Sequence, residues 1–404
     1  SNGLEKRPKL RFPGFDDPYR TITLGQIASL VNRTDPTSNA PIMMLSAGNG
    51  FIMQSEKYSR DNAGQSLKKY ILLKKGELAY NHGASKAKQY GCCYELTEDE
   101  ARIPYVYHCF KVSGAEHTPY VATALNNPKI DRQLKRLVSS SVRMDGLLNI
   151  SFDDYMSVIL HLPSLKEQTH IADFLKKLDE RITAQEKLVA SLKKYKRGLS
   201  KAVFSTNSEL FPKSTVASLG ELFPFIRNGF VGTVTPFFTS QENGVRYLQG
   251  TNIHDGKISD ETAFYVTQAF NQKHSKNILK SNDILVVQSG HVGECAVVGD
   301  NYAGSNCHAL IIMSNGGECA SDYICQYINS DDGKKKIAAI TTGNTIKHIL
   351  ATSIANIEVP LPSKKDQQRI AELLNSWDNR IEQEIRNLCK LVRIKEGLLQ
   401  QLFI

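Results

Sequence analysis

Apolar residues recur at alternating spacings of four and three positions in two long stretches of this chain. The first stretch covers residues 162–205 and the second covers residues 361–404. This spacing places the apolar side chains in one stripe along a helix, as in the seam of a coiled coil. A Leu-Pro pair opens each stretch, and proline has no N–H to offer to the interior of a strand or helix. The pattern therefore predicts two long helices that begin after these prolines.

The two stretches are copies of each other. Pro163 corresponds to Pro362 and Phe204 to Phe403, and both pairs are 199 positions apart, so no insertion separates the copies. A gapless repeat of this length indicates one structural unit used twice. The predicted seam positions are Ile171, Leu175, Leu178, Ile182, Gln185, Val189, Leu192, Lys196, Leu199 and Val203 in the first copy, and Ile370, Leu374, Trp377, Ile381, Glu384, Leu388, Leu391, Lys395, Leu398 and Leu402 in the second.

Both seams are polar at the same two places. Gln185 matches Glu384, and Lys196 matches Lys395. Polar seam residues lower stability but fix register and the choice of partner. We therefore favour a coiled coil over its alternative, an ordinary amphipathic bundle helix.

The repeat extends beyond the helices. Phe12 and Phe211 are again 199 positions apart, and Leu24-Gly25 resembles Leu219-Gly220. The start of the chain therefore matches the segment that follows the first helix. We expect residues 1–27 to pack near the C-terminal helix, with the two helices antiparallel and related by a pseudo-two-fold axis.

Two blocks of mixed α/β character, residues 28–161 and 223–360, lie between the repeated segments. Runs of apolar and β-branched residues predict strands at 105–112, 284–287 and 309–313. Residues 73–78 and 279–284 each read as a turn that leads into a strand, which indicates a shared fold. We predict an α+β protein with two mixed α/β domains and two long antiparallel coiled-coil helices. Its predicted segments are a first domain at 1–161, helical regions at 162–205 and 361–404, and a second domain at 206–360.

Composition narrows the class of partner. The chain has 50 Lys and Arg against 41 Asp and Glu, a net charge of +9, which weakly favours a polyanionic partner. Its eight cysteines contain no CxxC pair, which is typical of a reducing cytoplasm. We find no apolar run that could span a bilayer and no signal peptide. We therefore expect a cytoplasmic protein that does not associate with membranes.

Motifs of common catalytic sites are missing from the sequence. It contains no GxxxxGK[ST] phosphate loop, no GxGxxG, no HExxH, no paired CxxC and no GxSxG. Asp17-Pro18-Tyr19 lacks the second proline of an amino-methyltransferase motif. We therefore expect no catalytic residue and no metal site, and a chain that recognises rather than catalyses. A self-contained nuclease or methyltransferase remains an alternative.

One motif carries a family resemblance. Residues 162–182 and 361–381 both read Leu-Pro-x₄-Gln-x₂-Ile-Ala-x₂-Leu-x₃-Asp-x-Arg-Ile, and the chain begins with an Arg-Phe-Pro-Gly-Phe stretch at 11–15. Over essentially its whole length, the chain resembles the specificity subunit of type I restriction–modification systems. The resemblance implies two target recognition domains, each reading one half of an asymmetric, interrupted site on double-stranded DNA, and helices that set the spacer.

The resemblance also implies partners and cofactors. Two modification subunits would dock on the helical regions, bring S-adenosylmethionine and methylate adenine N6. Restriction and translocation subunits would add ATP and Mg²⁺, whereas this chain would hold no cofactor. The implied docking and coiled-coil residues are Gln168, Ile171, Leu175, Leu178, Asp179, Ile182, Gln367, Ile370, Leu374, Trp377, Asp378 and Ile381.

Residues that read DNA should lie on polar loops. Arg and Lys pair with guanine, Asn and Gln with adenine, and Lys, Ser and Thr reach phosphates. The candidates are Asn81, His82, Ser85, Lys86, Lys88, Gln89, Tyr90 and Arg143 in the first block, and Gln249, Thr251, Asn252, Gln288, Ser289, His291, Asn344, Thr345 and Lys347 in the second. Any one of them could instead be a solvated turn residue. A coiled-coil scaffold that pairs two protein ligands is the alternative function.

Overall fold

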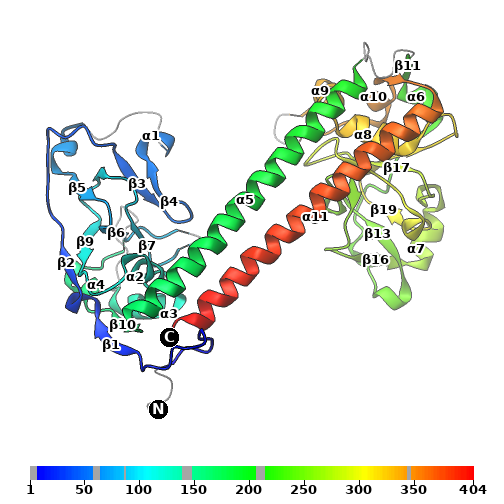
Figure 1. The fold of residues 1–404 in the computed structure, drawn as a ribbon. Coiled ribbons are helices and arrows are strands. Elements are labelled where there is room, and N and C mark those ends of the chain that lie inside the picture. The colour runs from blue at the N-terminus through cyan, green and yellow to red at the C-terminus, as the bar shows by residue number, and fades with distance from the viewer. Residues whose placement is uncertain (1–6, 58–63, 86–87, 139–147, 206–213, 344–346) are drawn as a thin grey trace. The chain divides into compact units, whose positions relative to one another are not determined.

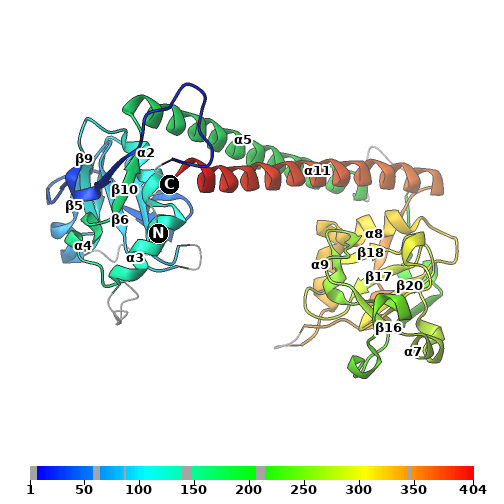
Figure 2. The same cartoon turned by 90° about the horizontal axis from the view of Figure 1, so that it is seen from below.

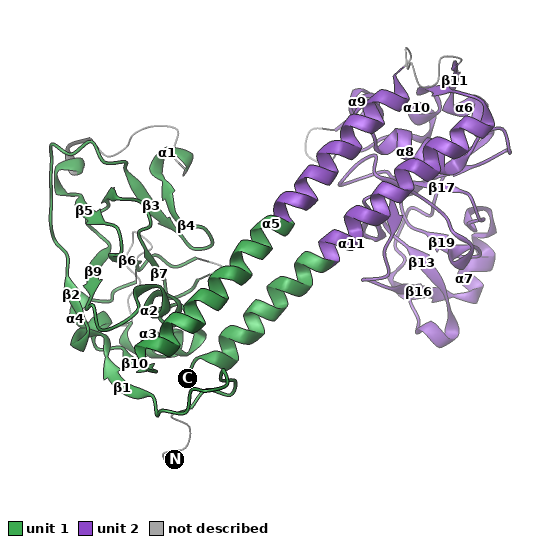
Figure 3. Cartoon of the chain, viewed as in Figure 1, with its two compact units in different colours: residues 1–185, 387–404 green, residues 186–386 purple. Residues whose placement is uncertain are grey.

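The structure is a computed structural model that describes residues 7–57, 64–85, 88–138, 148–205, 214–343 and 347–404. The chain forms two compact units (Figure 3). Unit 1 consists of residues 1–185 and 387–404, and unit 2 of residues 186–386. Each unit thus contains part of both long helices, whereas the sequence-based division gave the helices segments of their own.

The two predicted long helices are α5, Leu165–Phe204, and α11, Lys364–Leu402. Each is unbroken and about 60 Å long at ~1.5 Å per residue. All ten predicted seam positions in each helix are buried or partly buried. Between them lie exposed charged residues such as Lys176 and Glu180. Burial along the helices therefore follows the spacing that the sequence predicts.

The helices run antiparallel within each unit (Figures 1 and 2). In unit 1 Lys395 near the end of α11 pairs with Asp179 in the first half of α5. In unit 2 Lys196 near the end of α5 pairs with Asp378 in the first half of α11. The start of one helix therefore lies beside the end of the other in both units.

The described residues of unit 1 form four small sheets, ordered β1-β10, β2-β9-β6-β7, β3-β4 and β5-β8. Its strands are β1 Arg20–Thr23, β2 Ala28–Leu30, β3 Met43–Ser46, β4 Gly50–Met53, β5 Ile71–Lys74, β6 Leu78–Asn81, β7 Cys92–Glu95, β8 Glu100–Ile103, β9 His108–Val112 and β10 Ile159–Leu162. Its shorter helices are α1 Gln54–Lys57, α2 Thr118–Leu125, α3 Pro128–Leu137 and α4 Phe152–Met156.

Unit 2 also contains four sheets, ordered β11-β21, β12-β20-β17-β18, β16-β13-β19 and β14-β15. Its strands are β11 Thr215–Ser218, β12 Phe225–Asn228, β13 Gly244–Leu248, β14 Ile253–His254, β15 Lys257–Ile258, β16 Phe264–Thr267, β17 Ile284–Val287, β18 Cys295–Val297, β19 Asn306–Cys307, β20 Leu310–Ser314 and β21 Glu358–Leu361. Its shorter helices are α6 Leu219–Leu222, α7 Gln268–Lys273, α8 Ser321–Asn329, α9 Asp331–Ile340 and α10 Ala351–Ala355.

The two units share a topology at their centre. The sheet β2-β9-β6-β7 of unit 1 and the sheet β12-β20-β17-β18 of unit 2 have the same order of equivalent strands, all antiparallel. The matched turns before β6 and β17 are also built alike. Glu77 Oε2 accepts from Lys74 N at 2.8 Å, and Asp283 Oδ2 accepts from Lys280 N at 2.9 Å. The weak sequence likeness between the blocks therefore reflects a common fold.

Each unit closes its core with the ends of both long helices. In unit 1 Ile171 and Leu175 of α5 join Leu402 and Phe403 in one apolar cluster with the β2-β9-β6-β7 sheet. In unit 2 Val203 and Phe204 join residues at the start of α11 in the same manner. Each Å² of apolar surface removed from water contributes ~25 cal/mol of free energy. This burial therefore holds the helix ends to each unit.

The structure bears on two expectations from the sequence: where the N-terminal segment packs and where the strand at 105–112 begins. Leu10 donates its N–H to Gln401 O at 3.1 Å, so the N-terminal segment contacts the last turn of α11. The strand expected at 105–112 is shorter, because β9 begins only at His108 and Tyr105 is exposed in a turn. The equivalence of Phe12 and Phe211 falls partly on residue 211, which lies outside the described residues.

Candidate nucleic-acid interface

The loop after β6 holds the first group of candidate residues. His82 does not point to solvent. Its Nδ1 lies 2.8 Å from Leu148 O and its Nε2 lies 2.9 Å from Val106 O, and the residue is 5% exposed. Buried polar groups of this kind hold a fold together. The structure therefore corrects the expectation for His82, which is a structural residue.

Other members of this loop vary in exposure. Ser85 and Gln89 are exposed, whereas Asn81 is partly buried and accepts from Gly83 N at 2.9 Å. Lys88 donates through Nζ to Asn126 O at 2.8 Å, which ties the loop to the end of α2. Tyr90 packs partly buried against the core of unit 1. Lys86 and Arg143 lie outside the described residues.

In unit 2 the structure brings candidates from three loops together. Ser289 forms a β-bridge with His348, and Ile349 donates its N–H to Gln288 O at 3.1 Å, so the 288–291 turn lies beside the segment that contains Lys347. His291 Nε2 lies 3.1 Å from Ile253 O, just after the 249–252 loop. Ser289, Lys347 and Thr251 are exposed, and Gln249 and Gln288 are partly buried. Asn344 and Thr345 lie outside the described residues.

Asn252 is a second correction. It is fully buried, and its Oδ1 accepts from Gln249 N at 2.9 Å. Its Nδ2 donates to Ser259 O at 3.0 Å and to Thr262 O at 2.7 Å. Since every polar atom of this amide is used inside the unit, Asn252 shapes the loop and is not available to a base.

The candidate loops of the two units are equivalent. His82 and Gln288 both follow the last residue of matched strands, β6 and β17. His82 O accepts from Leu148 N at 2.9 Å, and Gln288 O accepts from Ile349 N at 3.1 Å. The two units thus place different side chains on a matched framework of backbone hydrogen bonds.

Two histidines near these loops are kept neutral by burial. Burial lowers the pKa of His108, which lies below the first loop with its Nε2 2.9 Å from Ile150 O. Burial also lowers the pKa of His308, whose Nδ1 lies 3.3 Å from Tyr247 Oη. Neither imidazole therefore adds positive charge to the loops at neutral pH.

Several implied docking residues are buried inside the chain instead. Gln168 and Gln367 are at most 2% exposed and play the same part in each unit. Gln168 Oε1 accepts from His117 N at 2.9 Å, and Gln367 Oε1 accepts from Ala320 N at 2.9 Å. These N–H groups belong to the N-cap residues of α2 and α8. Among the implied docking and coiled-coil residues, intrachain packing also buries Ile171, Leu175, Ile370, Leu374 and Ile381.

Burial of these residues fits the coiled-coil part of their expected role, whereas docking of a partner stays a prediction. Leu178, Ile182 and Trp377 remain partly buried in the seam. The ring of Trp377 lies 4.6 Å from that of Tyr195. Asp179 and Asp378 each form an ion pair with a lysine of the opposite helix, so these contacts also lie within the chain.

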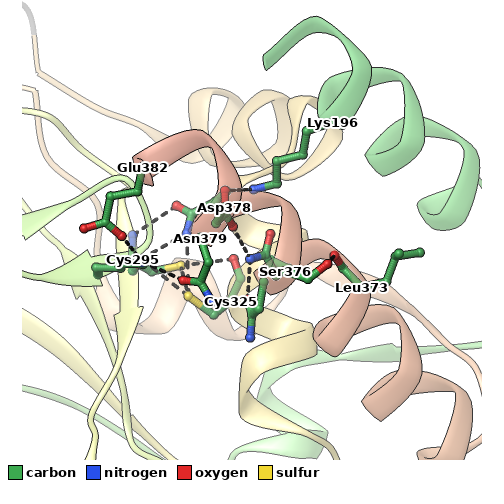
Figure 4. A network of polar contacts seen from close by, with 12 residues as sticks. Lys196, Cys295, Cys325, Leu373, Ser376, Asp378, Asn379 and Glu382 are labelled. Carbon is green, nitrogen blue, oxygen red and sulfur yellow. Dashed lines mark hydrogen bonds and ion pairs between the residues drawn. The ribbon is translucent and has the colours of Figure 1, made fainter. Parts of the chain in front are cut away.

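Figure 4 shows how α11 is held in unit 2. Asp378 accepts from Lys196 Nζ at 2.5 Å and from Gln326 Nε2 of α8 at 2.7 Å. One turn further along, Glu382 accepts from Lys257 Nζ of β15 at 2.5 Å. The sequence did not single out Lys257 or Gln326, because residues that pair across more than 50 positions leave no local pattern.

Sequence reasoning also missed two neighbours of His291. His254 ends β14 and Glu294 directly precedes β18, and both side chains gather around the His291 turn. The His291-x-x-Glu294 spacing was the one local signal of this group. His254 is 37 positions away, and only the fold brings it there.

A family model for the type I restriction modification DNA specificity domain matches residues 210–390. The type I restriction enzyme MjaVIII specificity subunit of Methanocaldococcus jannaschii is 24% identical over 279 residues, which span 66% of this chain and 66% of that protein.

Solved structures agree over nearly the whole chain. The crystal structure of a type I restriction-modification system S subunit from M. genitalium superposes with a TM-score of 0.61 at 15% identity, covering 98% of this chain and 99% of that one. A second structure, described as the structural basis of complex assembly and conformational transition of the type I R-M system, gives a TM-score of 0.57 at 16% identity, covering 98% and 99%. At such identity these matches show the fold.

These findings confirm the resemblance drawn from the sequence. In sequence over part of its length, and in fold over nearly all of it, the chain is similar to the specificity subunits of type I restriction–modification systems. Within the described residues, no helix is both long and apolar enough to cross a membrane.

Proposed function

We propose that each unit of this chain reads one half of an asymmetric, interrupted DNA site, and that α5 and α11 set the spacer between the halves. The observation that carries this proposal is the matched framework with unlike loops. His82 and Gln288 occupy equivalent positions, yet the exposed residues around them differ. Two copies of one fold with different surfaces suit two different short sequences.

Chemistry at the loops supports DNA as the ligand. The proposed reading residues are the exposed or partly exposed members of the loops: Asn81, Ser85, Lys88, Gln89 and Tyr90 in unit 1, and Gln249, Thr251, Gln288, Ser289 and Lys347 in unit 2. Amide, hydroxyl and ammonium groups pair with base edges and phosphates. The net charge of +9 adds attraction for the phosphate backbone.

Docking of two modification subunits is supported by a second apolar stripe on the helices. It occupies the heptad position just before every second seam residue, it is solvent-exposed, and Arg181 and Arg380 interrupt it. Its members are Phe174, Leu188 and Tyr195 on α5, and Leu373 and Ile394 on α11. Phe174 and Leu373 are repeat equivalents, as are Tyr195 and Ile394. Two equivalent sites suit two copies of one partner.

Roles outside this chain belong to the same proposal. The modification subunits would carry S-adenosylmethionine and methylate adenine N6. Restriction subunits would bring ATP and Mg²⁺. No catalytic residue is proposed for this chain.

The decisive experiment is to map methylation. The chain is assembled with its modification subunits, DNA of random sequence is treated with S-adenosylmethionine, and methylated adenines are located by long-read sequencing. We expect one two-part motif with an unread spacer of constant length. A continuous motif, or methylation without a motif, would contradict the proposal.

Salt separates this function from a protein scaffold. Binding that releases counterions from DNA weakens steeply as salt rises. We expect the assembled complex to show this dependence on DNA that holds its site. A scaffold for two protein ligands would show no DNA binding to measure. Incubating the chain alone with DNA, Mg²⁺ and S-adenosylmethionine tests the remaining alternative, and we expect neither cleavage nor methylation.

The docking surface has its own test. Tyr195→Lys together with Ile394→Lys places two charges on the apolar stripe, and we expect the modification subunits to be lost from the complex in size-exclusion chromatography. Lys187→Glu, which changes a charge on an exposed part of α5, is the matched control. Full assembly of the double variant would remove the stripe from the proposal.

A further inference from the structure

The end of β14 and the turn between β17 and β18 bring His254, His291 and Glu294 together at the surface of unit 2. Each offers one possible ligand atom, and these atoms all lie within 4.8 Å of one another. The turn is tightly built. Val287 donates to Glu294 O at 2.8 Å, and Gly293 donates to Val287 O at 2.9 Å. Both turn glycines, Gly290 and Gly293, have positive φ, which favours glycine.

The two imidazoles are oriented by backbone carbonyls. His254 Nε2 lies 2.9 Å from Thr251 O, and His291 Nε2 lies 3.1 Å from Ile253 O. A carbonyl oxygen only accepts, so each Nε2 carries the hydrogen. In the neutral ring this leaves the lone pair on Nδ1. Histidines that bind metals are held in this way, with the second ring nitrogen donating to a carbonyl or carboxylate.

The carboxylate of Glu294 completes the group. Its Oε2 is buried and has no hydrogen-bond partner among the described residues. His254 Nδ1 lies 3.8 Å from this oxygen, which is too long for a hydrogen bond. A buried carboxylate oxygen without a partner is costly and calls for an unseen water or ion. The rings of His254 and His291 stack beside it, with centroids 5.0 Å apart and planes 19° apart.

We propose that His254 Nδ1, His291 Nδ1 and the Glu294 carboxylate bind a divalent transition-metal ion of the Zn²⁺ class. Two imidazole nitrogens and one carboxylate form a known set of zinc ligands, with ligand distances of about 2.0–2.2 Å. Binding requires the three side chains to close around the ion. The side chains of His254 and Glu294 are 54% and 34% exposed, which leaves space for this adjustment.

Such an ion would act as a clamp. It would join the end of β14 to the β17–β18 turn and so fix the 249–252 loop against the 288–291 turn. These are the loops to which the proposed function assigns the reading of one half-site, and this consequence rests on that function. The metal site itself does not, since it depends only on the three side chains and their carbonyl partners.

The test measures metal binding by the full-length chain, freed of metal with a chelator. Zn²⁺ is added and its uptake is followed by competition with a chromophoric chelator. We expect one Zn²⁺ per chain. His254→Gln, His291→Gln and Glu294→Gln should each weaken its affinity by more than about 100-fold, beyond the ~10–100-fold that loss of an outer hydrogen-bond partner causes.

Controls distinguish this site from other donors. His170→Gln, an exposed histidine of unit 1, and Cys389→Ser, the exposed cysteine, should leave the affinity unchanged. Co²⁺ should give visible bands without the charge-transfer absorption of a thiolate ligand. Absence of uptake at micromolar Zn²⁺, or uptake that none of the three site variants alters, would overturn the metal site. Failure to find a two-part DNA motif would overturn the proposed function and leave the metal result standing.

Discussion

Lys196 Nζ of α5 lies 2.5 Å from Asp378 Oδ1 of α11, and its repeat equivalent, Lys395, lies 2.5 Å from Asp179 Oδ1. Each pair therefore joins a lysine of one copy to an aspartate of the other. The lysines are the polar seam positions that the sequence singled out. Because an ammonium group in a seam needs an anion opposite it, the two pairs admit one register between the helices.

Reversing one charge tests this register. Lys196→Glu sets a carboxylate against Asp378, and we expect a loss of about 1 kcal/mol in stability, typical of a partly exposed pair. Lys196→Glu with Asp378→Lys should recover most of that loss. Chemical denaturation of these two variants, and of Asp378→Lys alone, measures the losses. Losses that simply add in the double variant would show that the two residues are not coupled.

Gln367 offers a second test with a neighbour as its control. Gln367→Ala leaves Pro362 O and Ala320 N without their partner, which accounts for about 1–3 kcal/mol of stability. Gln368 is the next residue of the same helix and is exposed. Gln368→Ala should therefore change the unfolding midpoint little. Equal effects of the two substitutions would contradict the role assigned to the buried amide.

The free energy of unfolding should decrease as the pH falls from neutral to mildly acidic. Burial lowers the pKa of His108 below its ordinary value of 6.5, so the unfolded chain binds a proton that the folded chain refuses. Stability then rises with pH in this window and is lost as pH falls from 6.5 toward the lowered pKa. Thermal unfolding of the wild type and of His108→Asn, compared across this range, isolates the effect. Parallel pH profiles would contradict it.

Two variants can distinguish a residue that contacts DNA from a residue that shapes the unit 2 loops. Lys347→Ala removes an exposed ammonium group, so we expect unchanged folding, weaker DNA binding and a salt dependence reduced by about one counterion. Asn252→Ala removes three internal hydrogen bonds and should lower the unfolding midpoint. Binding by the assembled complex at several salt concentrations, with calorimetry of both variants, distinguishes the two. A folding defect in Lys347→Ala would contradict this assignment.

Helix length should set the DNA spacer. Seven residues inserted after Gln185 and seven after Glu384 lengthen both helices by about 10.5 Å, or about three base pairs. Both ion pairs stay in register, because each lies wholly on one side of the insertions. We expect the methylated motif to keep both half-sites and gain about three unread base pairs. An insertion in α5 alone is the control and should lower stability. Altered half-sites with the old spacer would contradict a spacer role.

The helices could be read from the sequence because their signal is local and occurs twice. Spacing of four and three positions defines the buried stripe from Ile171 to Val203 without reference to any other element. The strand at 284–287 was similarly visible as a short apolar run, and the strand predicted at 309–313 is β20, Leu310–Ser314, one position later. The start of β9 was not, since Tyr105 and Val106 suit a strand but lie in a turn.

The loops could not be read in the same way. His82 and Asn252 look like solvated loop residues, yet their hydrogen-bond partners come from segments that only the fold supplies. Leu148 lies 66 positions after His82, and no pattern around either residue announces that contact. Burial of Gln168 against the N-cap of α2 has the same origin. Local patterns therefore predicted the two long helices. Which loop residues are exposed depends on tertiary contacts, which no local pattern reveals.

The exchange of partners between the copies has a consequence for substitution. Loss of Lys196 would leave Asp378 without its counterion but would leave the pair of Lys395 and Asp179 intact. Each pair can therefore change only as a pair, and it can do so without the other. One repeated sequence thus supplies two ion pairs that do not depend on each other.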